Sequence, residues 1–368
     1  MADTTYFLGM ESSCDETAAA VVAVTDGRAT VLSSIVASQI ETHRLFGGVV
    51  PEIASRAHVE AISRITYRAL EEASLTPRDL TAVGVTAYPG LIGALLVGVN
   101  FAKGLAAAHD LPLVPIDHIK AHIAAAYLTE GDAPPPCAPF VALAASGGHT
   151  SLYFAEDPLH FSVIGRTRDD AIGEAFDKIG RMIGIPYPAG AGFDRLAAEG
   201  FCRATGLSDV GEAYLAFPRS EAARDAAYRL PSPAMHDGTL DFSFSGLKTA
   251  AINLLHHAEQ TGVPLDRSIL AAAYTYTAVE AVVRQAGEAL SRHTGAPFVV
   301  AGGVAANSHL RRRLADLCKK HGVALHIPPL SLCGDNGAMV AMATYFAFDA
   351  GIRADDRLNA SAADGVGM

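Results

Sequence analysis

The sequence predicts an α/β protein built from two copies of one plan, arranged as two domains with a cleft between them. Its 368 residues are more than a single hydrophobic core usually takes in. Half of the residues are hydrophobic and 18% are charged, which is the composition of a folded, core-forming chain. The same order of strands and helices also occurs twice, on either side of a proline-rich segment. Together these observations predict a duplicated two-domain fold.

The first copy is expected to contain three adjacent strands, a long helix, a strand, a helix, a strand and a last helix. Asp26-Gly27 is a typical hairpin turn, and Ile62, Ile65 and Ala69 would share one face of the long helix. These elements are expected at 6–10, 18–24, 30–35, 52–73, 82–85, 91–108, 113–116 and around His118 and His122.

Residues 133–139 are proline-rich and predict a linker, because proline suits neither a helix interior nor a central strand. The same order follows it. These elements are expected at 140–145, 151–154, 162–167, 171–183, 268–292, 298–301, 308–321, 324–327 and 336–348. Residues 185–265 are rich in glycine, proline and serine and predict an irregular insertion.

The predicted domains are therefore 1–132 and 140–350, with 351–368 as a flexible tail. This duplicated element order is typical of the actin-like class that includes sugar kinases and Hsp70 (the ASKHA fold). Proteins of that class bind their ligands in the cleft between the domains.

Composition excludes several other classes. The start of the chain lacks the positive charge of a signal peptide, and the most apolar stretch, 91–101, is shorter than the roughly 20 residues of a membrane span. Five cysteines without a C-x-x-C pair argue against a disulfide framework or a thiolate zinc cluster. A soluble cytoplasmic protein is expected. Its net charge of −11 argues against binding nucleic acid over a broad basic surface.

His118 and His122 are four residues apart, so a helix places both imidazoles on one face, with the spacing of two ligands of one metal. The competing interpretation is two ordinary histidines among the 14 in the chain. A zinc peptidase of the H-E-x-x-H type is disfavoured, because Ile119 stands where its glutamate base would be. Asp335, in a glycine-flanked turn, offers a third ligand; capping the next helix is its competing role, and Cys333 is a competing ligand. Two histidines and a carboxylate suit zinc or Fe(II).

Two glycine-rich turns follow strands, at 145–150 and 301–307. Paired glycines let backbone N–H groups approach a phosphate or a purine, and a helix N-terminus favours an anion. Neither turn fits the P-loop pattern. Nearby, Asp177 is a candidate for binding sugar hydroxyls, with an exposed helical acid as the competing interpretation. The segment 241–248 alternates aromatic and hydroxyl residues without indicating a role.

In this order, these motifs resemble those of the tRNA adenosine threonylcarbamoyltransferase family, formerly called the O-sialoglycoprotease or glycoprotease family. The resemblance covers nearly the whole chain. It rests on 9–17, 89–91, His118 with His122, 146–150, 173–178, 242–249, 302–307 and 334–336. It implies the actin-like fold and an enzyme that transfers the threonylcarbamoyl group from threonylcarbamoyl-AMP to N6 of adenosine 37. The tRNAs concerned read codons that begin with A, and AMP is released.

The resemblance also implies a role for each matching position. His118, His122 and Asp335 are expected to bind one divalent metal per subunit, Fe(II) or zinc. The adenylate is expected at Ala144, Ala145, Ser146, Gly147, Gly148, Asp177, Gly190, Asp194 and Asn307. Lys120 and Ala121 stand where many bacterial members have glutamate and glycine, which reverses the charge between the histidines.

The mixed anhydride of the adenylate is already activated, so the expected catalysis consists of positioning and electrostatic stabilisation without a covalent intermediate. Asp15 or Glu16 is expected to take the proton of the attacking amine, with a purely structural turn as the competing interpretation. Besides the tRNA anticodon loop, the resemblance implies a heterodimer with an inactive paralogue, a P-loop ATPase partner and no membrane.

Two other functions remain open from the sequence. One is an ATP-dependent phosphotransferase or ATPase of the same fold, which would hydrolyse ATP without tRNA. The other is a non-catalytic scaffold subunit of the same pathway, which would have lost its ligand residues. All three metal positions are present here, which disfavours the scaffold.

Overall fold

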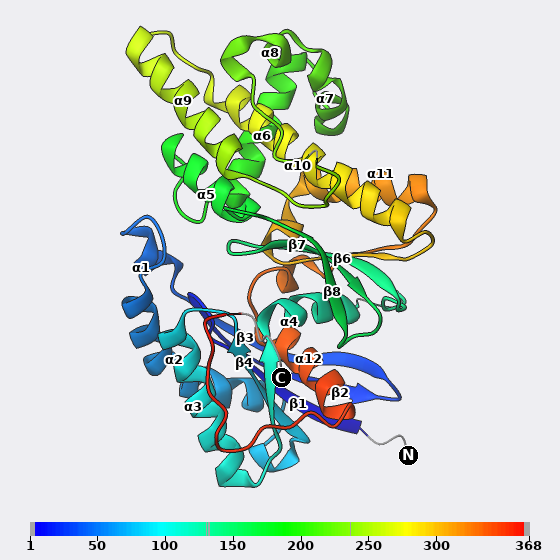
Figure 1. Cartoon of the computed structure of the whole chain (residues 1–368). Helices are drawn as coiled ribbons and strands as arrows, with labels where there is room; N and C mark the ends of the chain where they lie inside the picture. Colours follow the sequence, from blue (N-terminus) through cyan, green and yellow to red (C-terminus); the bar gives the residue numbers. More distant parts are fainter. Residues whose placement is uncertain (1–3, 130, 132, 236, 364–368) are drawn as a thin grey trace. The chain divides into compact units, whose positions relative to one another are not determined.

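The computed structural model describes residues 4–129, 131, 133–235 and 237–363, and Figure 1 labels its elements. By its internal contacts the chain divides into two units, each described by itself. The first unit comprises Met1–Ala138, Ala155–Phe161 and His326–Met368. The second comprises Pro139–Phe154 and Ser162–Leu325.

The first unit is built on a five-stranded mixed sheet with the order β3-β2-β1-β4-β5. Its strands are β1 (Thr4–Glu11), β2 (Glu16–Thr25), β3 (Arg28–Ser38), β4 (Ala82–Tyr88) and β5 (Leu113–Asp117). β1 to β3 pair antiparallel, whereas β4 pairs parallel with both β1 and β5. Asp26 and Gly27 have φ values of 51° and 75°, the left-handed pair that a two-residue hairpin turn requires, as predicted.

Helices cover both faces of this sheet. The helices and 3₁₀ turns of the unit are α1 (Ile40–Arg44), α2 (Pro51–Glu72), η1 (Pro77–Asp79), α3 (Ile92–His109), α4 (His118–Ala124), η2 (Ala125–Tyr127), η6 (Leu330–Leu332) and α12 (Gly337–Asp349). α2 and α3 pack their apolar residues on one face, and α4 and α12 pack on the other. In Figure 1 the orange-red α12 lies against the blue N-terminal strands.

Glycines allow α12 to lie this close to the sheet. A Cβ at Gly9 of β1 would be 2.1 Å from the backbone nitrogen of Ala341, and one at Gly84 of β4 would be 1.6 Å from Thr344 Oγ1. These distances are far inside van der Waals contact, so only glycine fits at either position. This contact packs α12, near the C-terminus, against the N-terminal strand β1 and against β4.

The second unit repeats the sheet of the first. The order of its sheet is β10-β9-β6-β7-β8. Counted from β8, this is the third, second, first, fourth and fifth strand of the unit, which is the same order as in the first unit. Its strands are β6 (Phe140–Ala145), β7 (Thr150–Ala155), β8 (Phe161–Arg166), β9 (Phe298–Ala301) and β10 (Leu325–His326). The predicted duplication is confirmed at the level of sheet topology.

The second unit contains more helix than expected. Its helices and 3₁₀ turns are α5 (Ile172–Met182), α6 (Gly190–Thr205), α7 (Val210–Ala216), η3 (Phe217–Arg219), α8 (Glu221–Arg224), η4 (Ala226–Tyr228), α9 (Ser245–Thr261), α10 (Arg267–Arg292), η5 (Gly303–Ala306) and α11 (Ser308–His321). The expectation of an irregular insertion at 185–265 is therefore wrong. Gly206 and Gly262 end α6 and α9 in left-handed conformations, and Gly200 lets α6 pack directly on the backbone of Ser268 in α10.

The contact units also differ from the predicted domain boundaries. α12, expected in the second domain, belongs to the first unit because it packs on β1 and β4. Much of the expected flexible tail is attached there too: the nitrogens of Ala354 and Ser361 donate to the carbonyls of Leu113 and Ala87, at 2.8 and 2.9 Å. Residues 364–368 of that tail lie outside the described residues. Residues 133–139 form neither helix nor strand, as their prolines predict.

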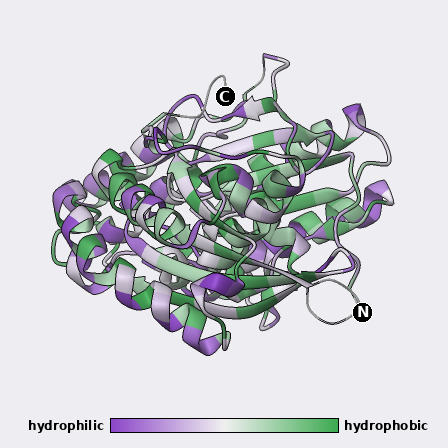
Figure 2. Ribbon diagram, turned by 90° about the horizontal axis from the view of Figure 1, so that it is seen from below, coloured by the Kyte–Doolittle hydropathy of each residue, from purple (hydrophilic) through white to green (hydrophobic). Residues whose placement is uncertain are grey.

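Among the described residues, α3 is long and apolar enough to cross a membrane by length and composition alone. Its face with Leu95, Val99, Ala102 and Leu105 packs into the core formed with α2 and the sheet. A core helix passes the same test. Figure 2, coloured by hydropathy, shows green apolar segments on both strands and helices, which is consistent with that explanation.

Candidate functional site

The three predicted metal ligands meet in the first unit. α4 begins directly after β5, and its N-cap residue Asp117 accepts hydrogen bonds from the nitrogens of Ile119 and Lys120, at 2.8 and 3.1 Å. This short helix places the rings of His118 and His122 one turn apart, with centroids at 4.6 Å.

Asp335 completes the cluster from the turn before α12. Its Oδ1 lies 3.1 Å from His122 Nε2 and 3.7 Å from His118 Nε2, and one ligand atom from each residue lies within 4.8 Å of the others. The competing role of helix cap falls to Asn336, whose side chain accepts from the nitrogen of Met339. Asp335 is therefore not needed as the cap of α12.

The donor set fits a divalent metal. His122 is 1% exposed, and neither of its ring nitrogens makes a well-formed hydrogen bond with a described residue, in spite of the short distance to Asp335. Buried polar atoms without partners are rare in folded proteins. Two imidazole nitrogens and one carboxylate oxygen that converge on one point form a ligand set typical of zinc or Fe(II).

Glu11 at the end of β1 orients the first histidine. Its buried carboxylate accepts from His118 Nδ1 at 2.9 Å, from Thr86 Oγ1 at 2.7 Å and from the nitrogen of Ser13 at 2.5 Å. Burial raises the pKa of Glu11, but the neighbouring His118 outweighs it, and the pKa lies below its usual value. With Nδ1 directed at Glu11, Nε2 is the ring nitrogen of His118 that faces Asp335 and would be the one to bind a metal. A carboxylate behind a metal-binding histidine is a recurrent arrangement.

Glu11 was not identified as a functional residue from the sequence. It lies within the motif 9–17, but its partner His118 is 107 positions away. A carboxylate directly after the apolar strand 6–10 was the one available signal, because a buried acid needs a partner.

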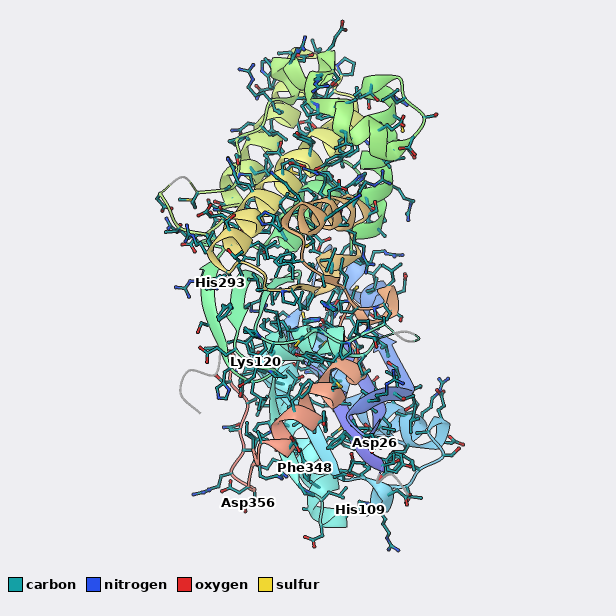
Figure 3. The ribbon with its side chains drawn as sticks, turned by 90° about the vertical axis from the view of Figure 1, so that its right-hand side faces the viewer. Asp26, His109, Lys120, His293, Phe348 and Asp356 are labelled. Atoms are coloured by element: carbon teal, nitrogen blue, oxygen red, sulfur yellow. The ribbon has the colours of Figure 1, made fainter. Side chains whose placement is uncertain are left out.

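Lys120 does not bring its charge to the ligands. Its Nζ donates to the carbonyl of Leu159 at 3.1 Å and lies 5.7 Å from the ring centre of Phe161, and two residues along a helix is about 200° around its axis. Figure 3 labels this lysine on α4. Ala121 is fully buried in the core beside α12. The unusual Lys-Ala pair is therefore compatible with the site.

Asp15 and Glu16 lie in the same unit, where the loop after β1 enters β2. Asp15 is buried, and Glu16 Oε1 accepts from Ser38 Oγ at 3.3 Å. Burial raises the pKa of Glu16 to about 9, and the charges of Asp335 and Asp15 contribute to this shift. The carboxyl group of Glu16 therefore lies in the electrostatic field of the candidate ligand Asp335.

The second unit contains a cavity of about 410 Å³, within the size range of small-molecule sites. Five of the nine residues predicted for the adenylate line it: Gly147, Asp177, Gly190, Asp194 and Asn307. Ala144 and Ala145 are buried at the end of β6, and Ser146 and Gly148 are outside the lining. The remaining lining was not predicted residue by residue and consists of Gly173, Phe176, Pro188, Ala191, Arg195, Gly303, Val304 and Ala306.

Polar contacts hold the cavity walls in place. Asp177 on α5 accepts from the nitrogen of Ala189 at 2.7 Å. Asp194 on α6 accepts from the nitrogen of Ser308 at 3.2 Å, and Asn307 caps α11 by accepting from the nitrogen of Leu310 at 2.9 Å. The N-terminus of the 14-residue α11 thus lies at the cavity wall, where an anion is favoured.

The glycine turns are packed against one another as well as against the cavity. A Cβ at Gly173 would lie 2.5 Å from the carbonyl oxygen of Ser146, and one at Gly302, whose φ is 89°, would lie 2.4 Å from that of Ala145. The turn 301–307 therefore needs glycine at position 302, and α5 needs glycine at position 173, where it approaches the turn 145–150. Phe176 was overlooked as a lining residue, although it lies inside the motif 173–178.

A model of the family described as TsaD, tRNA N6-adenosine threonylcarbamoyltransferase, matches residues 30–342 of this chain. A protein of that name from Clostridium botulinum (strain 657 / Type Ba4) is 45% identical over 360 residues, covering 98% of this chain and 97% of the relative. One from Geobacillus kaustophilus (strain HTA426) is 47% identical over 362 residues, with the same coverage of both chains.

Solved structures agree on the fold. HypF from T. kodakarensis superposes with a TM-score of 0.53 at 13% identity, covering 96% of this chain and 49% of HypF. Full-length HypF in its phosphate- and nucleotide-bound form gives 0.50 at 15% identity, covering 95% of this chain and 56% of that structure. At this level of identity the likeness concerns the fold alone, and it confirms the predicted actin-like class.

Proposed function

This chain belongs to the tRNA N6-adenosine threonylcarbamoyltransferase family, and from that premise we propose how its two units divide the reaction. The chain is a transferase that modifies tRNA. N6 of adenosine 37 forms a bond to the carbamoyl carbon of threonylcarbamoyl-AMP, the bond from that carbon to the phosphate oxygen breaks, and AMP leaves. The tRNAs are those that read codons beginning with A. The first unit would bind the metal and the second the AMP part.

The metal centre is proposed at His118, His122 and Asp335. The single observation that carries it is the buried His122, whose ring nitrogens make no well-formed hydrogen bond with a described residue, next to two further ligand atoms. A bound divalent metal supplies a Lewis acid for carbonyl and phosphate oxygens. Glu11 keeps His118 in the tautomer that leaves Nε2 free to bind. Both zinc and Fe(II) suit these ligands, one ion per chain.

The AMP part is proposed to occupy the cavity of the second unit. Backbone N–H groups near Gly147 and Gly303, together with the N-terminus of α11, suit the phosphate. Asp177 and Asp194 present carboxylate oxygens to ribose hydroxyls, and Phe176 gives an apolar surface for the purine. Positioning of this kind contributes most when the group to be transferred is already activated.

Asp15 is proposed to accept the proton of the attacking amine. Burial, with the charges of Asp335 and Asp15, raises the pKa of Glu16 to about 9, which makes Glu16 the weaker proton acceptor before a metal binds. Asp15 is the neighbouring carboxyl group and is buried. General-base catalysis of this kind typically raises the reaction rate by about 10²- to 10⁴-fold.

A chain with a net charge of −11 repels the phosphates of tRNA, so additional basic groups are needed to bind this substrate. Two of the basic residues on α11 are already engaged: Arg313 pairs with Glu280 at 2.6 Å, and Arg311 Nε donates to the carbonyl of Ala305 at 2.6 Å. We therefore propose that partners, an inactive paralogue and a P-loop ATPase, complete the tRNA-binding assembly. Leu45 and Phe46, exposed between α1 and α2, are suited to a protein contact.

A cytoplasmic location is proposed on two grounds. The substrate is a tRNA, and all five cysteines are free thiols, as is usual in a reducing compartment.

Reconstitution tests the proposed function. The full chain would be combined with its partners, tRNA, threonine, bicarbonate, ATP and an adenylate-forming enzyme, and the tRNA nucleosides analysed by mass spectrometry. The expected product is threonylcarbamoyladenosine, with at least a roughly 100-fold loss for His118→Ala or Asp335→Ala because either change removes a metal ligand. His109→Ala, in α3 of the same unit (Figure 3), is the matched control and should retain activity.

Two outcomes would contradict the proposal. The first is the absence of modified nucleoside in the complete mixture. The second is ATP hydrolysis by the chain alone that proceeds without tRNA and is unaffected by His118→Ala, which would favour an ATPase of the same fold.

A further inference from the structure

The loop between β1 and β2 is held from two opposite sides. On one side it contacts the metal centre: Ser13 Oγ lies 3.3 Å from His118 Nδ1, and the carbonyl of Ser13 accepts from the nitrogen of Leu91 at 2.8 Å. These contacts hold the first part of the loop. Asp15 and Glu16 follow directly after it, so their placement depends on what holds the rest.

The other side of the loop is held by His58, a fully buried histidine on α2. Its Nε2 lies 3.0 Å from the carbonyl oxygen of Cys14, and its Nδ1 lies 2.7 Å from Thr17 Oγ1. A carbonyl oxygen only accepts, so Nε2 carries the proton and donates. Nδ1 then accepts from the hydroxyl of Thr17, and the imidazole is neutral. Burial lowers the pKa of His58, which agrees with this state.

Gln39 supports the same part of the loop. Its backbone nitrogen donates to the carbonyl of Asp15 at 3.1 Å, and its side-chain oxygen lies 3.1 Å from His43 Nε2. Its side-chain nitrogen lies 3.5 Å from His58 Nδ1, at the limit of a hydrogen bond. Together with His58, these contacts fix the loop at three of the four positions from Cys14 to Thr17.

The position of these bonds suggests their purpose. His58 binds the residue before Asp15 and the residue after Glu16, so it brackets the two carboxyl groups that follow the contact of Ser13 with His118. The imidazole ring donates a hydrogen bond to the carbonyl of Cys14 from one nitrogen and accepts one from the hydroxyl of Thr17 at the other. A residue that merely filled this space would need neither nitrogen. A displacement of about 1 Å at a reacting group can cost about 10²-fold in rate.

We propose that His58 is a positioning residue for threonylcarbamoyl transfer: it holds Cys14 and Thr17 so that Asp15 and Glu16 keep their places in the loop that contacts His118. This inference rests on the proposed function. His58 itself touches neither the metal ligands nor a substrate, and it acts through the loop.

Three substitutions separate the two hydrogen bonds. His58→Phe keeps most of the ring volume and removes both bonds, His58→Gln retains a donor near the Nε2 position, and His58→Asn retains an acceptor near Nδ1. For His58→Phe we expect kcat to fall about 10- to 100-fold, with KM values for tRNA and adenylate changed less than about twofold. The Gln and Asn variants should recover part of the loss. Val59→Ala, at the exposed neighbouring position, is the control.

A double-mutant cycle tests the route through Thr17. Thr17→Val removes the hydroxyl with little change of volume and should lower kcat in the same direction. In the double variant with His58→Phe, Thr17→Val should lower kcat by a smaller factor than it does alone, because the two residues share one hydrogen bond. Bound Co(II), used as a visible-light probe of the ligand set, should give the same stoichiometry and spectrum in all variants. This counts the folded sites independently of activity.

Hydrogen exchange gives a readout that does not require transfer. In His58→Phe the peptide covering 12–18 should exchange faster than in the wild type, whereas peptides from α4 and α12 should not change. If His58→Phe lowered only the melting temperature and left both kcat per Co(II)-binding site and the exchange of 12–18 unchanged, the positioning role would be wrong. If the wild type transferred nothing but exchange at 12–18 still depended on His58, the proposed function would fail and the holding of the loop would stand.

Discussion

Replacing Glu11 by glutamine tests how the metal centre is built, because it removes a charge while keeping the shape of the side chain. The Oε1 atom of Glu11 accepts from the nitrogen of Ser13, and Oε2 accepts from Thr86 and His118. A glutamine offers one oxygen and one NH₂ group for these two places. If the NH₂ group replaces Oε1, it faces a backbone donor at 2.5 Å.

The opposite orientation is no better. If the NH₂ group replaces Oε2, it faces His118 Nδ1, which must then give up its proton. The proton moves to Nε2, and that nitrogen no longer has a lone pair for a metal. Thr86 can rotate its hydroxyl to accept, but His118 cannot satisfy both demands. Either orientation therefore disturbs the ligand or the loop next to it.

The cost follows from the bond that is lost. A hydrogen bond to a charged group contributes about 1.5–3 kcal/mol, which corresponds to roughly 10- to 150-fold in an equilibrium constant. Outer partners of metal ligands typically account for about 10- to 100-fold in metal affinity. Both figures lead to the same expectation, so Glu11→Gln should weaken metal binding by about 10- to 100-fold.

The assay is a titration of the metal-depleted chain with zinc against a competing chelator. Thr86→Val is the matched control, because it removes a neutral partner of the same carboxylate and should weaken binding by less than about tenfold. A zinc affinity of Glu11→Gln within twofold of the wild type would refute the role assigned to Glu11. Circular dichroism and the melting temperature would show whether the variant is folded.

Three further predictions concern packing, the cavity and pH. Gly84→Ala should destabilise the chain by at least about 1–3 kcal/mol in urea unfolding, because its Cβ meets Thr344, whereas Gly104→Ala, with open space around it, should not; equal stability of the two variants would contradict the packing. Asp177→Ala should weaken AMP binding about tenfold by calorimetry and leave zinc affinity unchanged; unaltered AMP binding would remove Asp177 from the site. Burial raises the pKa of Asp169, but hydrogen bonds from serines at the start of α9 outweigh this effect, so its pKa is lowered in the folded chain. The contribution of Asp169 to the free energy of unfolding is therefore complete above the unfolded pKa of about 3.9 and is lost as pH falls through the lower folded value. Unfolding free energy of Asp169→Asn should therefore depend less on pH below about 4 than that of the wild type, and identical pH profiles would contradict this.

The sequence was most informative where a pattern is local. The spacing of His118 and His122 predicts one helical face, and Asp26-Gly27 predicts its turn, since both depend on neighbours within a few residues. The repeated order of elements predicted the two sheets, which the structure has in the same strand order.

Long-range partners were not visible in the same way. Glu11 and His118 meet across 107 positions, and His58 and Cys14 across 44, so neither pair forms a pattern in one sequence. The segment 185–265 was misjudged for another reason. Its glycines suggested loops, but Gly200 allows one helix to touch another, and Gly206 ends a helix.

The central claim is that His118, His122 and Asp335 hold a metal that threonylcarbamoyl transfer requires. The most direct test measures metal content and transfer on the same samples of the assembled enzyme, before and after removal of metal by a chelator and after titration with zinc or, without oxygen, Fe(II). We predict that the transfer rate falls in proportion to the metal removed and returns when one equivalent per chain is bound. Transfer at the full rate by a chain without bound metal would contradict the claim.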